Sequence, residues 1–427
     1  MYICYEKPEV RAHMLEGGFG LEKESLRVDS QGFLSHTKHP FPQNKNIERD
    51  FCENQIELIT KVCNSPKELY LELLKLQKEV LNKLWNMETG REYLWQFSNP
   101  PYVRGEEDIL IATYEDELKE KEVYRRYLAE KYGKKKMLFS GIHFNFSFSD
   151  ELLKCAYNSE KEKSFRNFKD KIYLELAKKV TKYSWFLVYI TAASPMMDAS
   201  FFNKEQLGKD IKSKYASYRC SEIGYWNDFI PVLNYETVEE YVNGIKKYIL
   251  DGKLKSIGEL YYPVRLKPIK ENTLENLLSY GINHIELRMF DLNPFSVVGI
   301  FEEDIKFIHY FLLYLSSLPL VSFSDTEQIT AIKNMKNASY LDEEQIWIEN
   351  NNISKNILEE GISLLEDMDK FYEKLEILEA RELIIKQKNK FQKPKERYAI
   401  KLEELYRKDY VKKGIKLVEG YSRQNIN

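Results

Sequence analysis

Residues 20–28 read Gly20-Leu-Glu-Lys-Glu-Ser-Leu-Arg-Val28, and polar side chains alternate with apolar ones along this stretch. Three further stretches alternate in the same way: Glu53-Asn-Gln-Ile-Glu-Leu-Ile59, Ser140-Gly-Ile-His-Phe-Asn-Phe-Ser-Phe148 and Asn283-His-Ile-Glu-Leu-Arg-Met-Phe290. Successive side chains of a strand point to opposite faces, so a period of two predicts strands with one polar and one apolar face. We therefore expect an antiparallel sheet with one charged, concave face.

The polar faces of these strands carry acidic, histidine and arginine side chains. The residues that share a face are Glu22 with Glu24, Glu53 with Glu57, His143 with Asn145, and His284 with Glu286 and Arg288. Crowded carboxylates repel one another and cannot all stay ionised unless cations lie among them. Carboxylate oxygens suit Mg or Mn, and the sequence has no Cys/His cluster that would indicate Zn. The pattern indicates a polymetal site that handles phosphate.

Each of these residues also has an ordinary structural interpretation. A single strand glutamate usually faces solvent, a lone histidine such as His143 usually belongs to the core or the surface, and Glu286 with Arg288 can form an ion pair within one strand. In the functional interpretation Glu286 holds a cation and the Arg288 guanidinium meets a phosphoryl oxygen. The run Gly17-Gly-Phe-Gly20 lacks the Lys-Ser/Thr of a Walker loop, so close backbone approach is favoured over a phosphate cradle. Both interpretations stay open at this point.

Composition narrows the class of protein. The 427 residues, 43% of them hydrophobic, are enough for one large domain or two ordinary ones. Lys and Arg number 64 against 67 Asp and Glu, so the chain has no global positive field and we expect no nucleic-acid partner. The five cysteines form no C-x-x-C pair, which favours a reducing, cytoplasmic location. No export signal is visible, and the apolar segments are too short for a membrane span. For the oligomeric state, a monomer is favoured.

The order of local signals predicts the organisation of the chain. We expect a hairpin turn at residues 29–32 and helices over residues 66–87, up to residues 132–133, over residues 160–190 and over residues 238–250. After Pro294 the pattern is helical, and from residue 326 Glu and Lys recur at the spacing of exposed helices. The sequence therefore predicts a catalytic body over residues 1–325 and a helical C-terminal region over residues 326–427 packed on it.

The order of the motifs resembles the bacterial glutamate–cysteine ligases (gamma-glutamylcysteine synthetases). The first strand resembles the family's G-I-E-x-E-x-L-R-V, residues 140–147 match S-G-x-H-x-N-F-S, and residues 285–296 match I-E-x-R-x-x-D-x-N-P-F-S. Asp50 with Glu57-Leu-Ile-Thr resembles the second metal strand of the family. The blocks Ala193-Ser-Pro195, 219–225 and 259–265 follow in the expected order, so the resemblance covers about residues 15–300.

This resemblance implies a fold and an activity. The fold is α+β, similar to glutamine synthetase and the guanidino kinases, with a curled antiparallel sheet forming a funnel that helices surround. The activity is ligation of the gamma-carboxylate of L-glutamate to the amine of L-cysteine, through a gamma-glutamyl phosphate made from ATP. This is the first step of glutathione biosynthesis. Mg, with Mn as the alternative, is the expected cofactor, and ATP is the co-substrate.

The resemblance also implies roles for individual residues. The implied metal ligands are Glu22, Glu24, Asp50, Glu57, His143 and Glu286. Arg288 is the implied catalytic cation, facing the transferred phosphoryl group. The implied substrate-binding residues are Tyr124, Arg125, Asn145, Arg219, Tyr225, Tyr261 and Arg265. Glu53 and His284 share faces with these ligands but match no ligand of the family, so we expect structural or solvent-facing roles for them.

Three other functions stay open on the sequence alone. A sister carboxylate–amine ligase with a different amine acceptor differs only in the few side chains that select the acceptor. A non-catalytic binding homologue is disfavoured by the retained acidic and basic motif residues. A guanidino-type phosphotransferase would share the funnel without ligation. Because no second ATP-grasp module follows residue 300, we do not expect a bifunctional enzyme.

Overall fold

The computed structural model describes residues 3–114, 118–157, 164–350 and 353–426. At its centre is an open antiparallel sheet whose strands pair in the order β2-β3-β1-β5-β7-β6, with β4 added beside β1. The strands are β1 (Gly17–Val28), β2 (Ile47–Arg49), β3 (Gln55–Ile59), β4 (Tyr93–Leu94), β5 (Gly141–Phe148), β6 (Val264–Lys267) and β7 (His284–Asp291). The fold is therefore α+β, and the four strands predicted from the alternation are confirmed.

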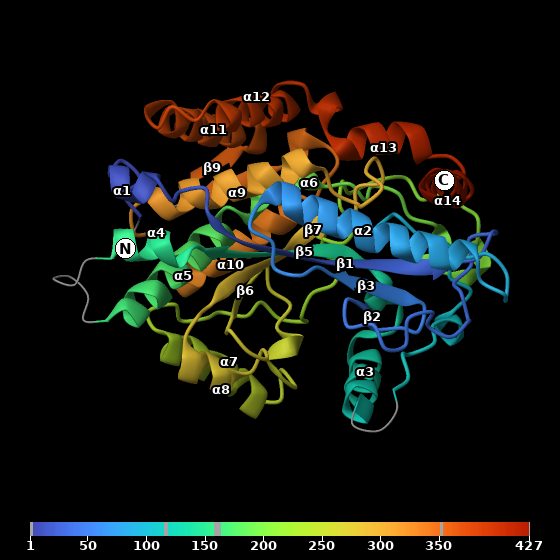
Figure 1. The fold of residues 1–427 in the computed structure, drawn as a ribbon. Coiled ribbons are helices and arrows are strands. Elements are labelled where there is room, and N and C mark those ends of the chain that lie inside the picture. Colours follow the sequence, from blue (N-terminus) through green and yellow to red (C-terminus); the bar gives the residue numbers. More distant parts are fainter. Residues whose placement is uncertain (1–2, 115–117, 158–163, 351–352, 427) are drawn as a thin grey trace.

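Helices cover the apolar face of the sheet. They are α2 (Pro66–Trp85), α5 (Phe165–Lys182), α6 (Ser184–Thr191) and α9 (Glu302–Ser317), and Figure 1 shows α2 and α9 lying along one side of the sheet. Helix α2 begins as predicted, because the Ser65 hydroxyl accepts the backbone N–H of Glu68 and Pro66 occupies the first turn. Strand residues such as Leu21, Phe144 and Leu287 are buried beneath this layer.

The segment predicted as one helix over residues 160–190 is two helices. Residues 160–163 lie outside the described residues, and α5 ends before Tyr183, whose backbone is not helical. The hydroxyl of Ser184 donates to the carbonyl of Thr181 at 2.8 Å, a local bond that competes with the helical ladder. The prediction of a single helix was wrong because this break lies within an uninterrupted apolar pattern.

The predicted turn at residues 29–32 is present, with the N–H of Asp29 bonded to the carbonyl of Phe33 at 3.0 Å and Gly32 at φ +88°. Its second arm makes one isolated bridge to β1, between Val28 and Leu34, and another from Phe33 to Tyr102. The helix predicted to end near residue 132 is α3 (Lys119–Tyr132), and the helix predicted over residues 238–250 is α7 (Val238–Leu250). Short α-helices of the described body are α1 (Pro8–Arg11), α4 (Asp150–Ala156) and α8 (Leu274–Tyr280), and single 3-10 turns lie between the longer elements.

The C-terminal region is mostly helical, as predicted. It contains α10 (Asp325–Asn337), α11 (Ile357–Lys374), α12 (Leu378–Gln392), α13 (Tyr398–Tyr406) and α14 (Tyr410–Ile426). A hairpin of β8 (Trp347–Asn350) and β9 (Ile353–Asn356) interrupts these helices. It was not predicted, because two four-residue strands give a weak signal among the surrounding Glu, Asn and Lys residues.

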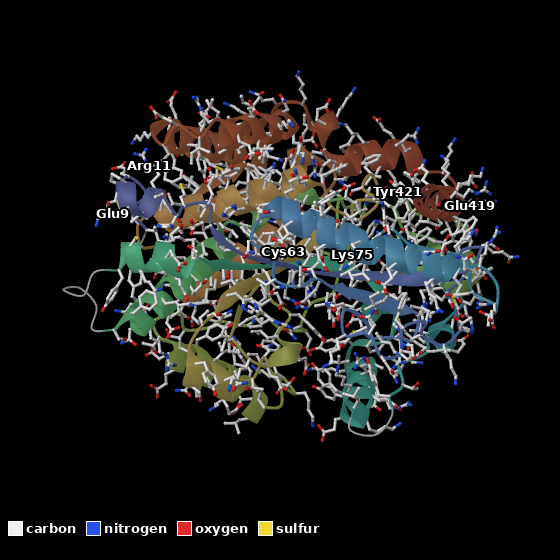
Figure 2. All side chains as sticks on the ribbon, viewed as in Figure 1. Glu9, Arg11, Cys63, Lys75, Glu419 and Tyr421 are labelled. Carbon is white, nitrogen blue, oxygen red and sulfur yellow. The ribbon has the colours of Figure 1, made fainter. Side chains whose placement is uncertain are left out.

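These C-terminal helices pack back onto the body. Figure 1 shows α11, α12 and α13 as an outer layer beyond α9. Helix α14 contacts α2 and β4, and its Tyr421, labelled in Figure 2, donates to the carbonyl of Pro294 at 2.7 Å. The division at residue 325 stays a prediction. Among the described residues, no helix combines the length and the apolar character that a bilayer crossing requires.

Candidate functional site

The register of the sheet brings the predicted site residues into rows across neighbouring strands. The directly opposed pairs are Glu24 with Glu57, Glu22 with His143, Asn145 with Glu286, and Glu286 with Arg265. Of these residues, Glu22, Glu24, Glu57, His143 and Arg265 line a cavity of about 230 Å³, whereas Asn145 and Glu286 do not; helix α3 and the loop before β6 contribute further lining residues. The shared face inferred from the period of two is therefore a single concave surface.

One side of this cavity is acidic. Glu22, Glu57 and His143 each place one ligand-type atom so that the three atoms lie within 4.8 Å of one another. Nδ1 of His143 is 3.1 Å from a carboxylate oxygen of Glu22, and Nε2 is 3.6 Å from one of Glu24. Glu24 and Asp50 line the same cavity. His143 thus lies between two carboxylates from the adjacent strand.

Burial and mutual repulsion change the protonation of this acidic side. Burial, together with the charges of Asp50 and Glu22, raises the pKa of Glu57 well above its usual value. Burial and Asp50 likewise raise the pKa of Glu24 to about 8, and burial raises that of Asp50. Burial and the charge of Arg288 lower the pKa of His143 to about 4. The imidazole is therefore neutral and has a ring nitrogen that can bind a metal ion. Several carboxylates with one neutral imidazole form a donor set that fits a hard divalent cation.

The opposite side of the site is cationic. The fully buried Glu286 carboxylate forms ion pairs with Arg288 through one oxygen and with Lys267 through the other, while Arg265 lies 3.8 Å away. Although burial opposes it, the charges of Lys267, Arg288 and Arg265 hold the pKa of Glu286 well below its usual value. Both oxygens of Glu286 therefore contact protein cations, and its assignment as a metal ligand stays a prediction.

Lys267 is absent from the residues predicted from the sequence. It lines the cavity from β6, two residues after Arg265. The alternation in Val264-Arg-Leu-Lys267 was the available signal, but a strand of four residues is too short for a periodic pattern to stand out.

The predicted substrate-binding residues do not all reach the cavity. Those that line it are Tyr124, Arg125, Tyr225, Tyr261 and Arg265. Asn145 donates to a carboxylate oxygen of Glu22 at 3.1 Å, and Arg219 borders a small adjoining hollow with Tyr225 and Arg288. Arg125 donates to the backbone carbonyls of Arg49 at 3.2 Å and of Asp50, so it fixes the Asp50 segment against α3.

A tyrosine-rich wall that includes Tyr225 and Tyr261 borders the cavity beside Arg288. The rings of Tyr225 and Tyr261 lie 4.1 Å apart, and Tyr132 packs edge-on against Tyr261. The buried Glu259 carboxylate accepts the hydroxyl of Tyr132 at 2.7 Å and the ammonium of Lys131 at 2.6 Å, which joins α3 to the loop before β6. This wall supplies an apolar surface with polar tips beside the charged groups.

A buried carboxylate holds Arg219 in place. Asp291, at the end of β7, accepts the N–H of Ala193 at 2.9 Å, the hydroxyl of Ser194 at 2.7 Å and that of Ser217 at 3.0 Å. The Arg219 guanidinium in turn donates to the carbonyl of Arg288 at 2.8 Å. It lies over Gly141, where any Cβ atom would collide with it.

Three sequence features have structural roles. Glu53 lies just before β3, and its carboxylate accepts the N–H of His39 at 2.9 Å and lies 3.4 Å from Arg49, outside the cavity. His284 lies beside Asn283 at 3.2 Å and does not line the cavity. Gly18 belongs to β1 rather than to a phosphate loop, and a Cβ there would meet the hydroxyl of Ser147. Close strand approach therefore accounts for this glycine.

The fold and the site together define an α+β protein whose open antiparallel sheet carries an acidic cluster opposite a cationic wall. A sequence model of one such family, the glutamate–cysteine ligases, matches residues 4–338. The chain belongs to the glutamate–cysteine ligase family.

Similar proteins and structures agree with this membership. The chain is 38% identical over 378 residues to the glutathione biosynthesis bifunctional protein GshAB of Clostridium perfringens, covering 84% of this chain and 48% of that protein. A Listeria monocytogenes GshAB is 36% identical over 421 residues, or 95% of this chain and 54% of that protein. The chain thus spans about half the length of these curated relatives.

Two solved structures share the fold. The crystal structure of a bifunctional glutathione synthetase from Pasteurella multocida has a TM-score of 0.84 and 28% identity, over 99% of this chain and 54% of that one. A glutamate–cysteine ligase from Francisella tularensis, in complex with AMP, also has a TM-score of 0.84, at 23% identity over 97% of this chain and 89% of that one. The second likeness bears on the fold alone.

Proposed function

We propose that this protein joins the gamma-carboxylate of L-glutamate to the amine of L-cysteine in an ATP-dependent reaction, the first step of glutathione biosynthesis. The observation that carries the proposal is the pairing, in one cavity of a chain of this family, of an acidic cluster with the Arg288 guanidinium. Phosphoryl transfer needs both features: ligands for cations that accompany the nucleotide, and a fixed positive charge at the phosphoryl group.

The reaction has two steps. A gamma-carboxylate oxygen of glutamate attacks the terminal phosphorus of ATP, the bond to ADP breaks, and an acyl phosphate forms. The amine of cysteine, having lost a proton, then attacks the acyl carbon, and the C–O bond to phosphate breaks to leave an amide. Arg288, held by Glu286, faces the phosphoryl group in both steps. Its planar guanidinium matches the geometry of phosphoryl oxygens.

We assign the cation to Mg, with Mn as the substitute. The proposed ligands are Glu22, Glu24, Asp50, Glu57, His143 and Glu286. Bound cations of this kind neutralise the polyphosphate and the charge that develops during transfer. The raised pKa values of Glu24, Glu57 and Asp50 support this assignment, because a cation among these carboxylates relieves their repulsion.

The amino-acid substrates occupy the end of the cavity with the tyrosine-rich wall. Tyr124, Tyr225 and Tyr261 border the acceptor, where an apolar surface suits the short side chain of cysteine. The remaining proposed contacts to substrates are those of Arg125, Asn145, Arg219 and Arg265. Arg219 serves a substrate carboxylate, because Asp291 fixes its loop and its guanidinium borders the hollow beside Tyr225 and Arg288.

The test is glutamate-dependent release of phosphate. Purified protein receives ATP, Mg and L-glutamate with L-cysteine, L-alanine, L-serine or L-2-aminobutyrate, and we expect cysteine to give the highest kcat/KM. A higher value for another amine would show a sister ligase, and no ADP with any amine would show a binding protein. A sulfoximine analogue that ATP can phosphorylate should also inhibit slowly and tightly, because the mechanism passes through glutamyl phosphate.

We further propose that the protein acts as a monomer in the cytoplasm. All five cysteines are free thiols, which is the state expected in a reducing compartment. Light scattering of the purified protein tests the oligomeric state, and fractionation of cells tests the location.

A further inference from the structure

Lys267 lines the cavity but has no role in the two steps of the proposed ligation. Its side chain is only 16% exposed, and its ammonium is paired with the buried Glu286 carboxylate. An ordinary surface lysine keeps its head in water and moves freely. Lys267 instead holds a fixed position in the wall of the cavity.

Three cationic side chains lie around one carboxylate on this side of the cavity. Arg265, Lys267 and Arg288 surround the single carboxylate of Glu286. Arg265 also donates to the carbonyls of Leu260 at 2.8 Å and Gly258 at 2.6 Å, so it mainly holds the loop before β6. Arg288 and Lys267 occupy opposite oxygens of Glu286 and both line the cavity. The wall therefore presents two neighbouring cations to an anionic ligand.

The position of Lys267 along the sheet identifies the end of the cavity that it serves. On β7, Arg288 is followed toward one end by Asp291, which faces Gly141 and the segment that carries Arg219, next to Tyr225. Lys267 lies toward the other end, opposite His284 and one position beyond the pair that Ile285 makes with Phe146. The tyrosine-rich wall and Lys267 thus lie on opposite sides of Arg288.

In-line phosphoryl transfer requires the nucleophile and the leaving group on opposite sides of the transferred phosphorus. If the amino acids lie beside the tyrosine-rich wall and the phosphoryl group beside Arg288, the leaving diphosphate lies on the side of Lys267. A lysine ammonium is a compact point charge that suits a phosphate chain.

We propose that Lys267 binds the polyphosphate of the nucleotide and that Glu286 positions it there, next to Arg288. This inference rests on the proposed ligation, and it adds a nucleotide-binding residue on β6. Lys267 contacts the part of the nucleotide that becomes ADP. Its loss therefore weakens binding of the nucleotide rather than binding of the amino acids.

The experiment compares wild-type protein with Lys267→Met, Lys267→Arg and the control Lys270→Met. The control substitution removes the same charge three residues away. Lys270 lies on the exposed surface, where its ammonium donates to the Tyr280 hydroxyl at 2.7 Å. Calorimetry measures the affinity for Mg·ADP, and steady-state kinetics measure KM for ATP and for glutamate. Lys267→Met should raise both the Kd for Mg·ADP and the KM for ATP by about tenfold or more, which is the effect of losing one charged hydrogen bond. KM for glutamate should change less than about twofold, the smaller effect expected of an unbroken contact.

Lys267→Arg should recover most of the ADP affinity, and Lys270→Met should match the wild type. Unchanged ADP affinity in Lys267→Met would overturn the inference, as would a rise confined to KM for glutamate. Equal weakening in Lys270→Met would assign the effect to the general field of the protein and also overturn it. If wild-type protein binds ADP but makes no amide, the proposed ligation fails while the calorimetry still tests Lys267.

Discussion

Replacing His309 by phenylalanine should make the protein less sensitive to acid. His309 lies on α9 and is 3% exposed, with its ring 4.8 Å from that of Phe19 and 5.4 Å from that of Phe146. Burial among these rings lowers its pKa from the usual 6.5 to about 3. Near pH 6.5 the imidazole of the unfolded chain therefore takes up a proton, whereas the imidazole of the folded protein stays neutral.

The sign of the effect follows from proton binding. Between pH 6.5 and pH 3 the unfolded chain holds a proton on this side chain that the folded protein does not, so acid favours unfolding. From these two pKa values, the free energy of unfolding should fall by about 2 kcal/mol between pH 8 and pH 5 through His309 alone. The figure is insensitive to the folded pKa as long as that value stays below about 4.

The assay is urea unfolding of wild type, His309→Phe and His309→Gln at pH 8 and pH 5. The two replacements pack differently, but a packing penalty is the same at both pH values and cancels in the difference. Both variants should lose about 2 kcal/mol less than the wild type on going to pH 5. Equal losses in all three proteins would refute a neutral, buried His309.

Three further predictions concern the cavity. Gly141→Ala should raise KM for glutamate by about tenfold, with little change in thermal midpoint, because the new methyl displaces the Arg219 guanidinium. The control is Gly420→Ala, where a Cβ meets no neighbour. An unchanged KM in Gly141→Ala would show that Arg219 does not contact substrate. Glu286→Gln should lower the free energy of unfolding in urea by about 3 to 5 kcal/mol, because it leaves Arg288 and Lys267 without their buried counter-charge; a loss below about 1 kcal/mol would contradict that account. Mg or Mn at a hundred times its Kd should stabilise the wild type by about 2.7 kcal/mol, and chelation should reverse this. Glu57→Gln should lose most of that gain while Glu53→Gln, whose carboxylate lies outside the cavity, keeps it; equal gains in both would contradict the assigned ligands.

Much of the site could be predicted from single strands. The period of two placed Glu22, Glu24 and His143 on polar strand faces, and it placed Ile142 and Phe144 on the opposite, apolar face. This succeeded because side-chain alternation is a local property of extended backbone. The same reasoning failed where a local pattern was short or uniform. The four residues of β6 hid Lys267, and the apolar run through Tyr183 hid a break between two helices.

The sequence by itself determined which residues share a strand face, where α2 and α7 begin, and which family the motifs resemble. Tertiary structure alone decided which strands are neighbours, since β1 pairs with both β3 and β5, and β5 with β7, across long stretches of chain. That pairing brings Glu57, Glu22 and His143 within reach of one cation and encloses Glu286 among three side-chain cations. The physical reason is that charge–charge interactions and burial depend on distances between strands, whereas alternation depends only on the backbone of one strand.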